Sequence, residues 1–106
     1  MSATQVVTYQ KPGATFSSGE EAYQNKNAFY SAELTASIDQ YFSQMMTDGI
    51  LLGPTSYSWN QATETLTVQR EVSDLELFNN SRTYDVELAL SKAVEAGWIH
   101  LGTVST

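Results

Sequence analysis

The pattern of apolar and polar residues along this chain has a period of two in three separate segments. Gln5–Gln10, Tyr57–Trp59 and Thr65–Val72 alternate in this way, which predicts strands, because successive side chains of a strand point to opposite faces. Pro12-Gly13 ends the first strand. The polar segment 60–63 predicts a turn, so the second and third strands form a hairpin.

Two longer segments have a period of three to four, and both end at a glycine. Apolar residues of Phe29–Asp48 fall on one helical stripe, and a second stripe starts at about Tyr84. Gly49 and Gly97 follow these stretches, and a large apolar residue comes after each, which predicts helices closed by a left-handed glycine cap. Trp98–Val104 is the last predicted strand.

Polar residues indicate two shorter helical pieces. Ser18 fits the first position of a capping box, so a helix is expected near Glu20, with a break or kink at 25–27. Ser73-Asp74 offers another cap, which predicts one short helical turn ahead of the longer helix.

These elements follow the order β-α-β-β-α-β over a single domain, residues 1–106. We therefore predict an α+β fold of ferredoxin-like topology, with a four-stranded antiparallel sheet and two helices on one face. The first and third strands are expected at the centre of the sheet. The other sheet face has no helix to cover it.

The uncovered face leads to a prediction about assembly. The last strand carries Trp98 and His100 on one face and Ile99 and Leu101 on the other, and the hairpin adds Tyr57 and Trp59 on a single side. A sheet that is apolar on both faces packs against something on both. We therefore expect a homo-oligomer, with a dimer favoured because two-fold dimers are the commonest closed assembly.

Composition excludes several partners. Apolar residues make up 42% of the chain, enough for a core, whereas charged residues make up only 16%, against about 25% in typical domains. Twelve acidic and five basic residues give a net charge of −7, and the basic residues are dispersed. We therefore expect no nucleic-acid partner and no anionic membrane surface, because both need clustered Lys and Arg.

The chain has no cysteine and one histidine, which excludes disulfides, thiolate metal sites, iron–sulfur clusters and multi-histidine metal sites. We predict no cofactor and no metal. Residues 1–4 lack the basic and apolar regions of a signal peptide, and Ile50–Leu52 is the longest aliphatic run. A soluble, cytoplasmic protein is therefore expected.

Four short segments, in this element order, resemble the dimeric α+β-barrel group of ferredoxin-like proteins. They are Lys11-Pro12-Gly13, Asp48-Gly49-Ile50, Tyr57–Trp59 and Leu66–Ser73. The group includes small cofactor-independent monooxygenases and many uncharacterised proteins. The resemblance implies the fold and a dimer, and it places no catalytic motif on this chain.

His100 and Arg70 are the candidate catalytic residues. His100 lies on the same strand face as Trp98, where we expect either a general base or hydrogen-bond donor in an aromatic pocket, or a histidine that is packed in the core or at an interface. Arg70 lies on the apolar side of its strand, in line with Leu66 and Val68. Its guanidinium either binds a carboxylate ligand in a sheet-face pocket, pairs with an acid across an interface, or emerges at a strand end.

Tyr57, Trp59 and Trp98 are candidates for a ligand pocket or for an oligomer interface, and aromatic residues at such spacing also serve simply as core. The chain has neither a Gly-x-Ser-x-Gly elbow nor a phosphate-binding glycine loop. A binding or structural role in a small oligomeric protein is therefore the leading functional interpretation. The alternative is a cofactor-independent monooxygenase-like enzyme or a small-ligand sensor that uses an aromatic pocket.

Overall fold

The computed structural model describes residues 2–82 and 84–106. The strands and helices, in chain order, are β1 (Ala3–Gln10), α1 (Gly19–Lys26), α2 (Ala32–Thr47), β2 (Ser56–Asn60), β3 (Thr65–Val72), α3 (Leu75–Asn80), α4 (Val86–Glu95) and β4 (Ile99–Ser105). The predicted strands and the two long helices are all present within a few residues of the expected bounds.

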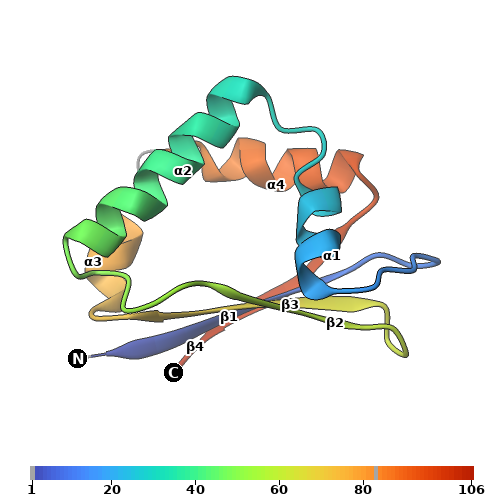
Figure 1. The fold of residues 1–106 in the computed structure, drawn as a ribbon, viewed down its shortest axis with the longest axis horizontal. Coiled ribbons are helices and arrows are strands. Elements are labelled where there is room, and N and C mark those ends of the chain that lie inside the picture. The colour runs from blue at the N-terminus through green and yellow to red at the C-terminus, as the bar shows by residue number, and fades with distance from the viewer. Residues whose placement is uncertain (1, 83) are drawn as a thin grey trace.

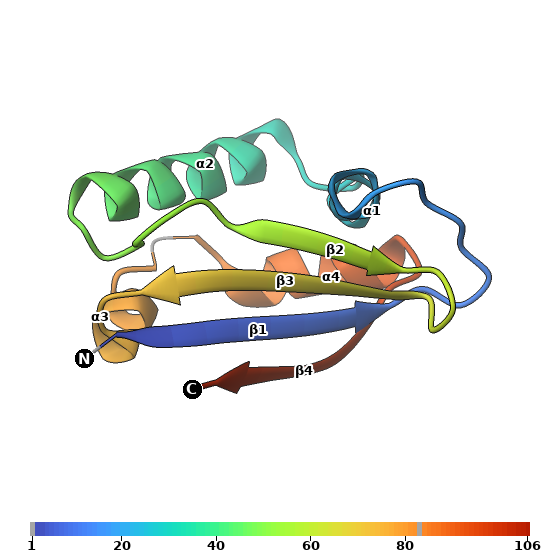
Figure 2. The same cartoon turned by 60° about the horizontal axis from the view of Figure 1, so that its bottom comes forward.

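The four strands form one sheet in the order β2-β3-β1-β4, and all three neighbouring pairs are antiparallel (Figure 2). The predicted α+β class and four-stranded antiparallel sheet are therefore confirmed. The strands β1 and β3 lie at the centre, and β2 and β4 are the edges.

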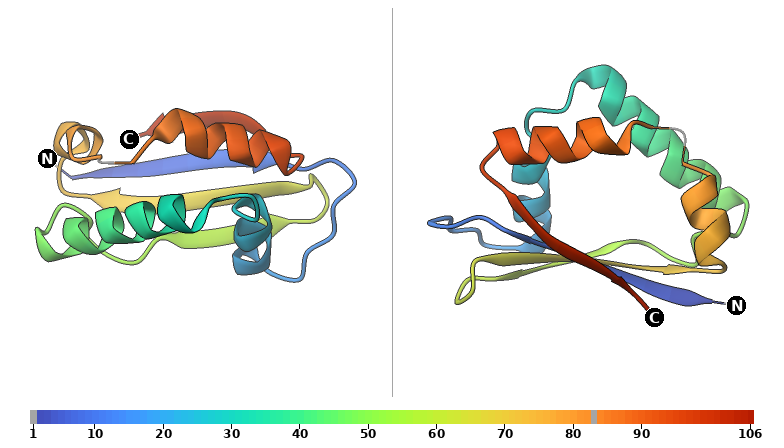
Figure 3. Two further views of the ribbon diagram at one scale, coloured as in Figure 1. Left: turned by 90° about the horizontal axis from the view of Figure 1, so that it is seen from above. Right: turned by 180° about the vertical axis from the view of Figure 1, so that it is seen from behind.

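Each connection across the sheet contains two helices, so the expected count of two covering helices is too low. The short helical pieces predicted near Glu20 and after Ser73-Asp74 are separate helices, α1 and α3. In each connection the short helix comes first, α1 or α3, and lies close to an end of the sheet. The longer helix that follows, α2 or α4, extends above the sheet (Figures 1 and 3). A polar side chain caps each of the four: Ser18, Ser31, Asp74 and Asp85 each accept a hydrogen bond from a first-turn backbone N–H. Separate caps divide each connection into two helices.

No helix in the described part of the chain has both the length and the apolar character needed to cross a membrane.

Both long helices end at the predicted glycines. Gly49 has φ 72° and Gly97 has φ 92°, in the left-handed region. After α2, the N–H groups of Gly49 and Ile50 donate to the carbonyls of Met46 and Met45, at 3.2 and 2.9 Å. The same pair of bonds closes α4, so both ends are Schellman caps.

One sheet face is apolar and packs under the helices. Val7 and Tyr9 of β1 and Leu66 and Val68 of β3 are buried there, at the centre of the main core. Directly paired residues share a face, so Tyr57, paired with Val68, also faces the helices.

The opposite face differs from the prediction. Its central and β2 positions are mostly Ser, Thr, Gln and Asn, and its large apolar residues are concentrated on β4, where Ile99 is 48% exposed and Val104 is 61% exposed. The expected second apolar face is therefore limited to one edge strand. Tyr57 and Trp59 are not part of it.

A bulge interrupts the pairing of β4 with β1. Tyr9 pairs with His100 and Thr8 with Gly102, which leaves Leu101 as an extra residue. Because of this shift, His100 and Thr103 lie on the same face although they are three residues apart. Both side chains face the helices.

Candidate functional site

A pocket of about 340 Å³ lies between the β4 side of the sheet and the helices α3 and α4, and is called the Arg70 pocket below. Its sheet wall consists of Gln5, Val7, Tyr9, Arg70, His100, Thr103 and Ser105. Its helix-side wall consists of Phe78, Asn79, Arg82, Val86 and Leu90. The two residues that the sequence singled out as catalytic candidates, Arg70 and His100, therefore line one pocket.

Arg70 reaches the pocket from β3, the strand next to β1. Its Nη1 donates to Oε1 of Gln5, its direct partner across the strand pair, at 3.2 Å. Its guanidinium carbon lies 5.1 Å from the ring centre of Phe42 and 5.8 Å from that of Phe78. Its Nε is buried and has no hydrogen-bond partner among the described residues. An N–H group that is shielded from water without an acceptor is costly, so this arginine is incompletely satisfied.

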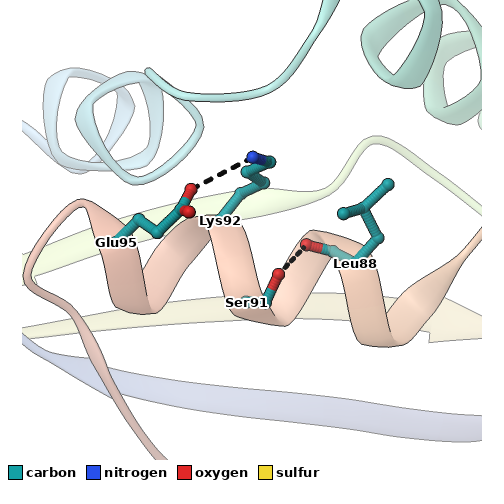
Figure 4. Close-up of polar contacts among 4 residues, drawn as sticks. All are labelled: Leu88, Ser91, Lys92 and Glu95. Carbon is teal, nitrogen blue, oxygen red and sulfur yellow. Dashed lines mark hydrogen bonds and ion pairs between the residues drawn. The ribbon is translucent and has the colours of Figure 1, made fainter.

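The cations on the helix-covered side of the sheet lack acidic partners. Among residues 2–82 and 84–106, the one ion pair joins Lys92 Nζ to Glu95 Oε2 at 3.1 Å, on the outside of α4 (Figure 4). Arg82 instead donates to Oδ1 of Asn79 at 2.9 Å. The Arg70 pocket therefore holds two arginines, and its described walls contain neither Asp nor Glu.

His100 stands at the exposed rim of the pocket. Its ring lies 5.3 Å, centre to centre, from that of Tyr9, and its Nε2 lies 3.1 Å from the Thr103 hydroxyl. Burial raises the pKa of Tyr9 to about 12, although the positive charge of Arg70 opposes this shift. The Tyr9 hydroxyl therefore stays protonated at neutral pH.

Lys26, at the end of α1, is a second cation inside the fold and is only 4% exposed. Its Nζ lies 4.9 Å from the ring centres of Tyr9 and Tyr23 and 5.5 Å from that of Tyr30. It donates to Oδ1 of Asn27 at 2.8 Å. Burial, followed by repulsion from Arg70, lowers the pKa of Lys26 to about 8.

The aromatic candidates form a separate cluster on the helix-covered side. Trp98 is 2% exposed, stacks on Phe16 at 5.8 Å and meets Trp59 edge-on at 5.9 Å. Tyr57 stacks on Tyr23 of α1 at 4.1 Å. Tyr57, Trp59 and Trp98 therefore pack against the chain itself and do not line the Arg70 pocket.

A second hollow, of about 380 Å³, lies beside α2 and includes Tyr41, Gln44 and Asp48 in its wall. Three of its polar side chains have hydrogen bonds within the chain: Gln44 Nε2 donates to Asp48 Oδ1 at 2.9 Å, and the Tyr41 hydroxyl donates to the Phe78 carbonyl at 3.3 Å. Its described wall contains no cation. The Arg70 pocket is the better candidate because its described walls hold two arginines and no acidic residue, and the buried Nε of Arg70 has no hydrogen-bond partner among the described residues.

Three residues of this region were not predicted from the sequence: Gln5, Arg82 and Lys26. Gln5 carried a signal, because it stands two residues before Val7, in the inward register of β1, where a polar side chain is unusual. The burial of Lys26 follows from how α1 packs on the sheet. No local pattern in the sequence indicates that packing.

The described residues contain no group of three or more His, Cys, Asp or Glu side chains arranged to hold a metal ion. A comparison with protein-family models finds no match for this chain, and a comparison with curated proteins also finds none. The resemblance to the dimeric α+β-barrel group therefore stays a prediction, and inference about function depends on the pocket.

Proposed function

We propose that this protein binds a small molecule in the Arg70 pocket. The observation that carries the proposal is the convergence of Gln5, Arg70, Arg82 and His100 on a pocket that also presents the apolar side chains of Val7, Phe78, Val86 and Leu90. Its volume of about 340 Å³ is within the usual range of ligand sites, roughly 300–1,000 Å³.

A fragment screen tests this proposal. We expect some small aromatic and aliphatic fragments to shift the backbone amide NMR signals of pocket residues such as Val7, Val86 and Leu90. Thr103→Trp should abolish these shifts, because Thr103 lines the pocket and an indole there fills it.

Val104→Trp is the matched control, because Val104 pairs with Val6 on the opposite face of the sheet. Fragments should still bind to this variant. Binding that survives Thr103→Trp, or a complete lack of pocket hits on the unmodified protein, would refute the proposal.

The position of His100 at the pocket rim favours one alternative, the cofactor-independent monooxygenase-like enzyme that the resemblance implies. The imidazole is exposed and has a single hydroxyl contact, so it is free to accept a proton from a bound molecule. Pocket ligands incubated with the protein in air, with products followed by mass spectrometry, separate binding from turnover. Conversion that His100→Ala leaves unchanged would exclude the assigned role.

We also propose that two copies form a dimer through β4. This edge strand has exposed backbone groups and exposed Ile99, Leu101 and Val104, and it carries no Asp, Glu, Lys or Arg. Two acidic chains can therefore meet there without like charges facing each other, and antiparallel self-pairing suits a two-fold axis.

Size-exclusion chromatography with light scattering measures the mass. A dimer is expected, and Val104→Lys should convert it to a monomer. Trp59→Ala should leave the assembly unchanged, since Trp59 packs inward against Phe16 and Trp98. A monomeric mass for the unmodified chain at micromolar concentration would contradict this proposal.

We also propose that the fold has ferredoxin-like topology. The order β2-β3-β1-β4, with one pair of helices in each connection, supports a ferredoxin-like domain. The additional short helices α1 and α3 are then elaborations of the two crossovers.

A further inference from the structure

We propose that the ligand of the Arg70 pocket is a small organic acid, whose carboxylate is bound by Arg70 and whose apolar body packs against the helix-side wall. This inference rests on the proposed function, because it names the chemical class of the molecule bound at the same site. Three observations support the inference: the hydrogen bonds that Arg70 lacks, the positive charges near the pocket, and the apolar residues in the pocket wall.

The first observation is the unsatisfied guanidinium of Arg70. Arginine has five N–H groups, and among the described residues the protein provides one acceptor for them, Oε1 of Gln5. The Nε–H is shielded from water as well, without any partner. A carboxylate has two oxygens with the spacing of a guanidinium fork, so it satisfies two N–H groups together.

The second observation is uncompensated positive charge in a strongly acidic protein. Arg70 and Arg82 line the pocket, and Lys26 is buried beyond the ring of Tyr9, yet none of the three has an acidic partner among residues 2–82 and 84–106. The charge of Arg70 affects several neighbouring groups. It lowers the pKa of Lys26, and it opposes the rise in pKa that burial causes in Tyr9 and Tyr84. An anion in the pocket would offset this repulsion.

The third observation concerns the rest of the ligand. Phe78, Val86 and Leu90 are the apolar part of the helix-side wall, beside Asn79 and Arg82, and Val7 adds an apolar side chain from the sheet wall. A bare inorganic anion would leave this surface without a contact. An organic acid with a ring or branched chain fills it and places its charge at Arg70, which is the arrangement expected of a specific site.

Paired probes test the class directly. The protein is titrated with benzoate and benzamide, and with 1-naphthoate and 1-naphthamide, while pocket amides and the Arg70 Nε–H signal are followed by ¹⁵N NMR. Each pair has nearly the same shape and differs in charge. We expect the carboxylates to bind at least about tenfold more tightly than their amides, as a charge-assisted pair requires, and to shift the Arg70 Nε–H signal.

Two variants and a control complete the test. Arg70→Met should reduce the preference to nearly onefold, and Arg70→Lys, which keeps the charge and has a compact ammonium, should lose most of it. Arg70→Lys also covers the possibility that Arg70→Met does not fold. Lys92→Met, which removes a partly exposed cation of α4 that does not line the pocket, should leave the preference intact.

The outcomes separate the two proposals. Amides that bind in the pocket as tightly as carboxylates would overturn the organic-acid inference and leave a neutral-ligand pocket standing. A carboxylate preference that persists in both Arg70 variants would overturn the assignment of the carboxylate to Arg70, and the inference with it. If neither member of either pair shifts the pocket signals, while other fragments in the screen do, the organic-acid inference also fails. If no fragment of any kind binds, the proposed function fails with it.

Discussion

The buried amine of Lys26 makes the stability of this fold depend on pH in a defined direction. The pKa of this amine falls from 10.5 to about 8 on folding, because burial disfavours the ammonium and Arg70 repels it. Between these values the unfolded chain binds more protons than the folded protein, so the free energy of unfolding must rise with pH. Below pH 8 both states are charged and the full cost of burial remains.

The magnitude follows from the same two values. One pKa unit corresponds to about 1.4 kcal/mol, so the whole shift costs about 3 kcal/mol at neutral pH. Between pH 7 and pH 9 the folded amine loses its proton while the unfolded one keeps it, which recovers about 1 kcal/mol.

Burial raises the pKa of Tyr9 and Tyr57 to about 12. Their unfolded phenols ionise first, so stability should fall again above about pH 9.5.

Urea unfolding followed by circular dichroism at pH 7, 8 and 9 measures this rise. Lys26→Met keeps the length of the side chain and removes the titration, so its stability should not rise over the same range. Lys92→Met should behave like the unmodified protein, because Lys92 is on the surface and paired with Glu95. If the Lys26→Met and unmodified curves run parallel within about 0.3 kcal/mol, the assigned burial of the charge is wrong.

Three further substitutions test the packing. Gly19→Ala should cost about 1–3 kcal/mol, because a Cβ there would lie 2.3 Å from the Tyr57 carbonyl, whereas Gly53→Ala meets nothing within 4 Å and should be nearly neutral. Trp98→Ala should cost about 3 kcal/mol or more in the same urea assay, while Val94→Ala, at a 64% exposed position, should change stability by less than about 0.5 kcal/mol. Asp85→Ala should remove about 1 kcal/mol by deleting the α4 cap, and an unchanged midpoint would contradict that role.

Most of the secondary structure could be predicted because its signals are local. Gly49 and Gly97 terminate their helices for a reason contained in a few neighbouring residues, and the strand alternation depends only on backbone geometry. The short helices α1 and α3 had a signal in their caps, Ser18 and Asp74, whereas the start of the long helix α4 was less clear. Asp85 is a cap in the structure, yet in the sequence an aspartate between Tyr84 and Val86 is equally compatible with one continuous helix start.

Local sequence patterns do not show which face of the sheet carries the hairpin residues Tyr57 and Trp59. Alternation shows that Tyr57 and Trp59 share a face, but it does not show which face the helices cover. That choice depends on the register with β3, where Tyr57 pairs with the buried Val68. Arg70 could be placed correctly because Leu66 and Val68 precede it in the same register. Its lack of an acidic partner is a property of the folded arrangement alone.

The bulge in β4 also determines how this strand would tolerate a deletion. In a regular strand, loss of one residue turns every later side chain to the opposite face. Here β4 already contains one residue more than β1 across from it. Loss of Leu101 would therefore restore even pairing and leave His100 and Thr103 pointing into the pocket, whereas loss of Val104 would reverse the facing of Ser105. Leu101 is thus the one residue of β4 that could be deleted without turning a later side chain to the other face.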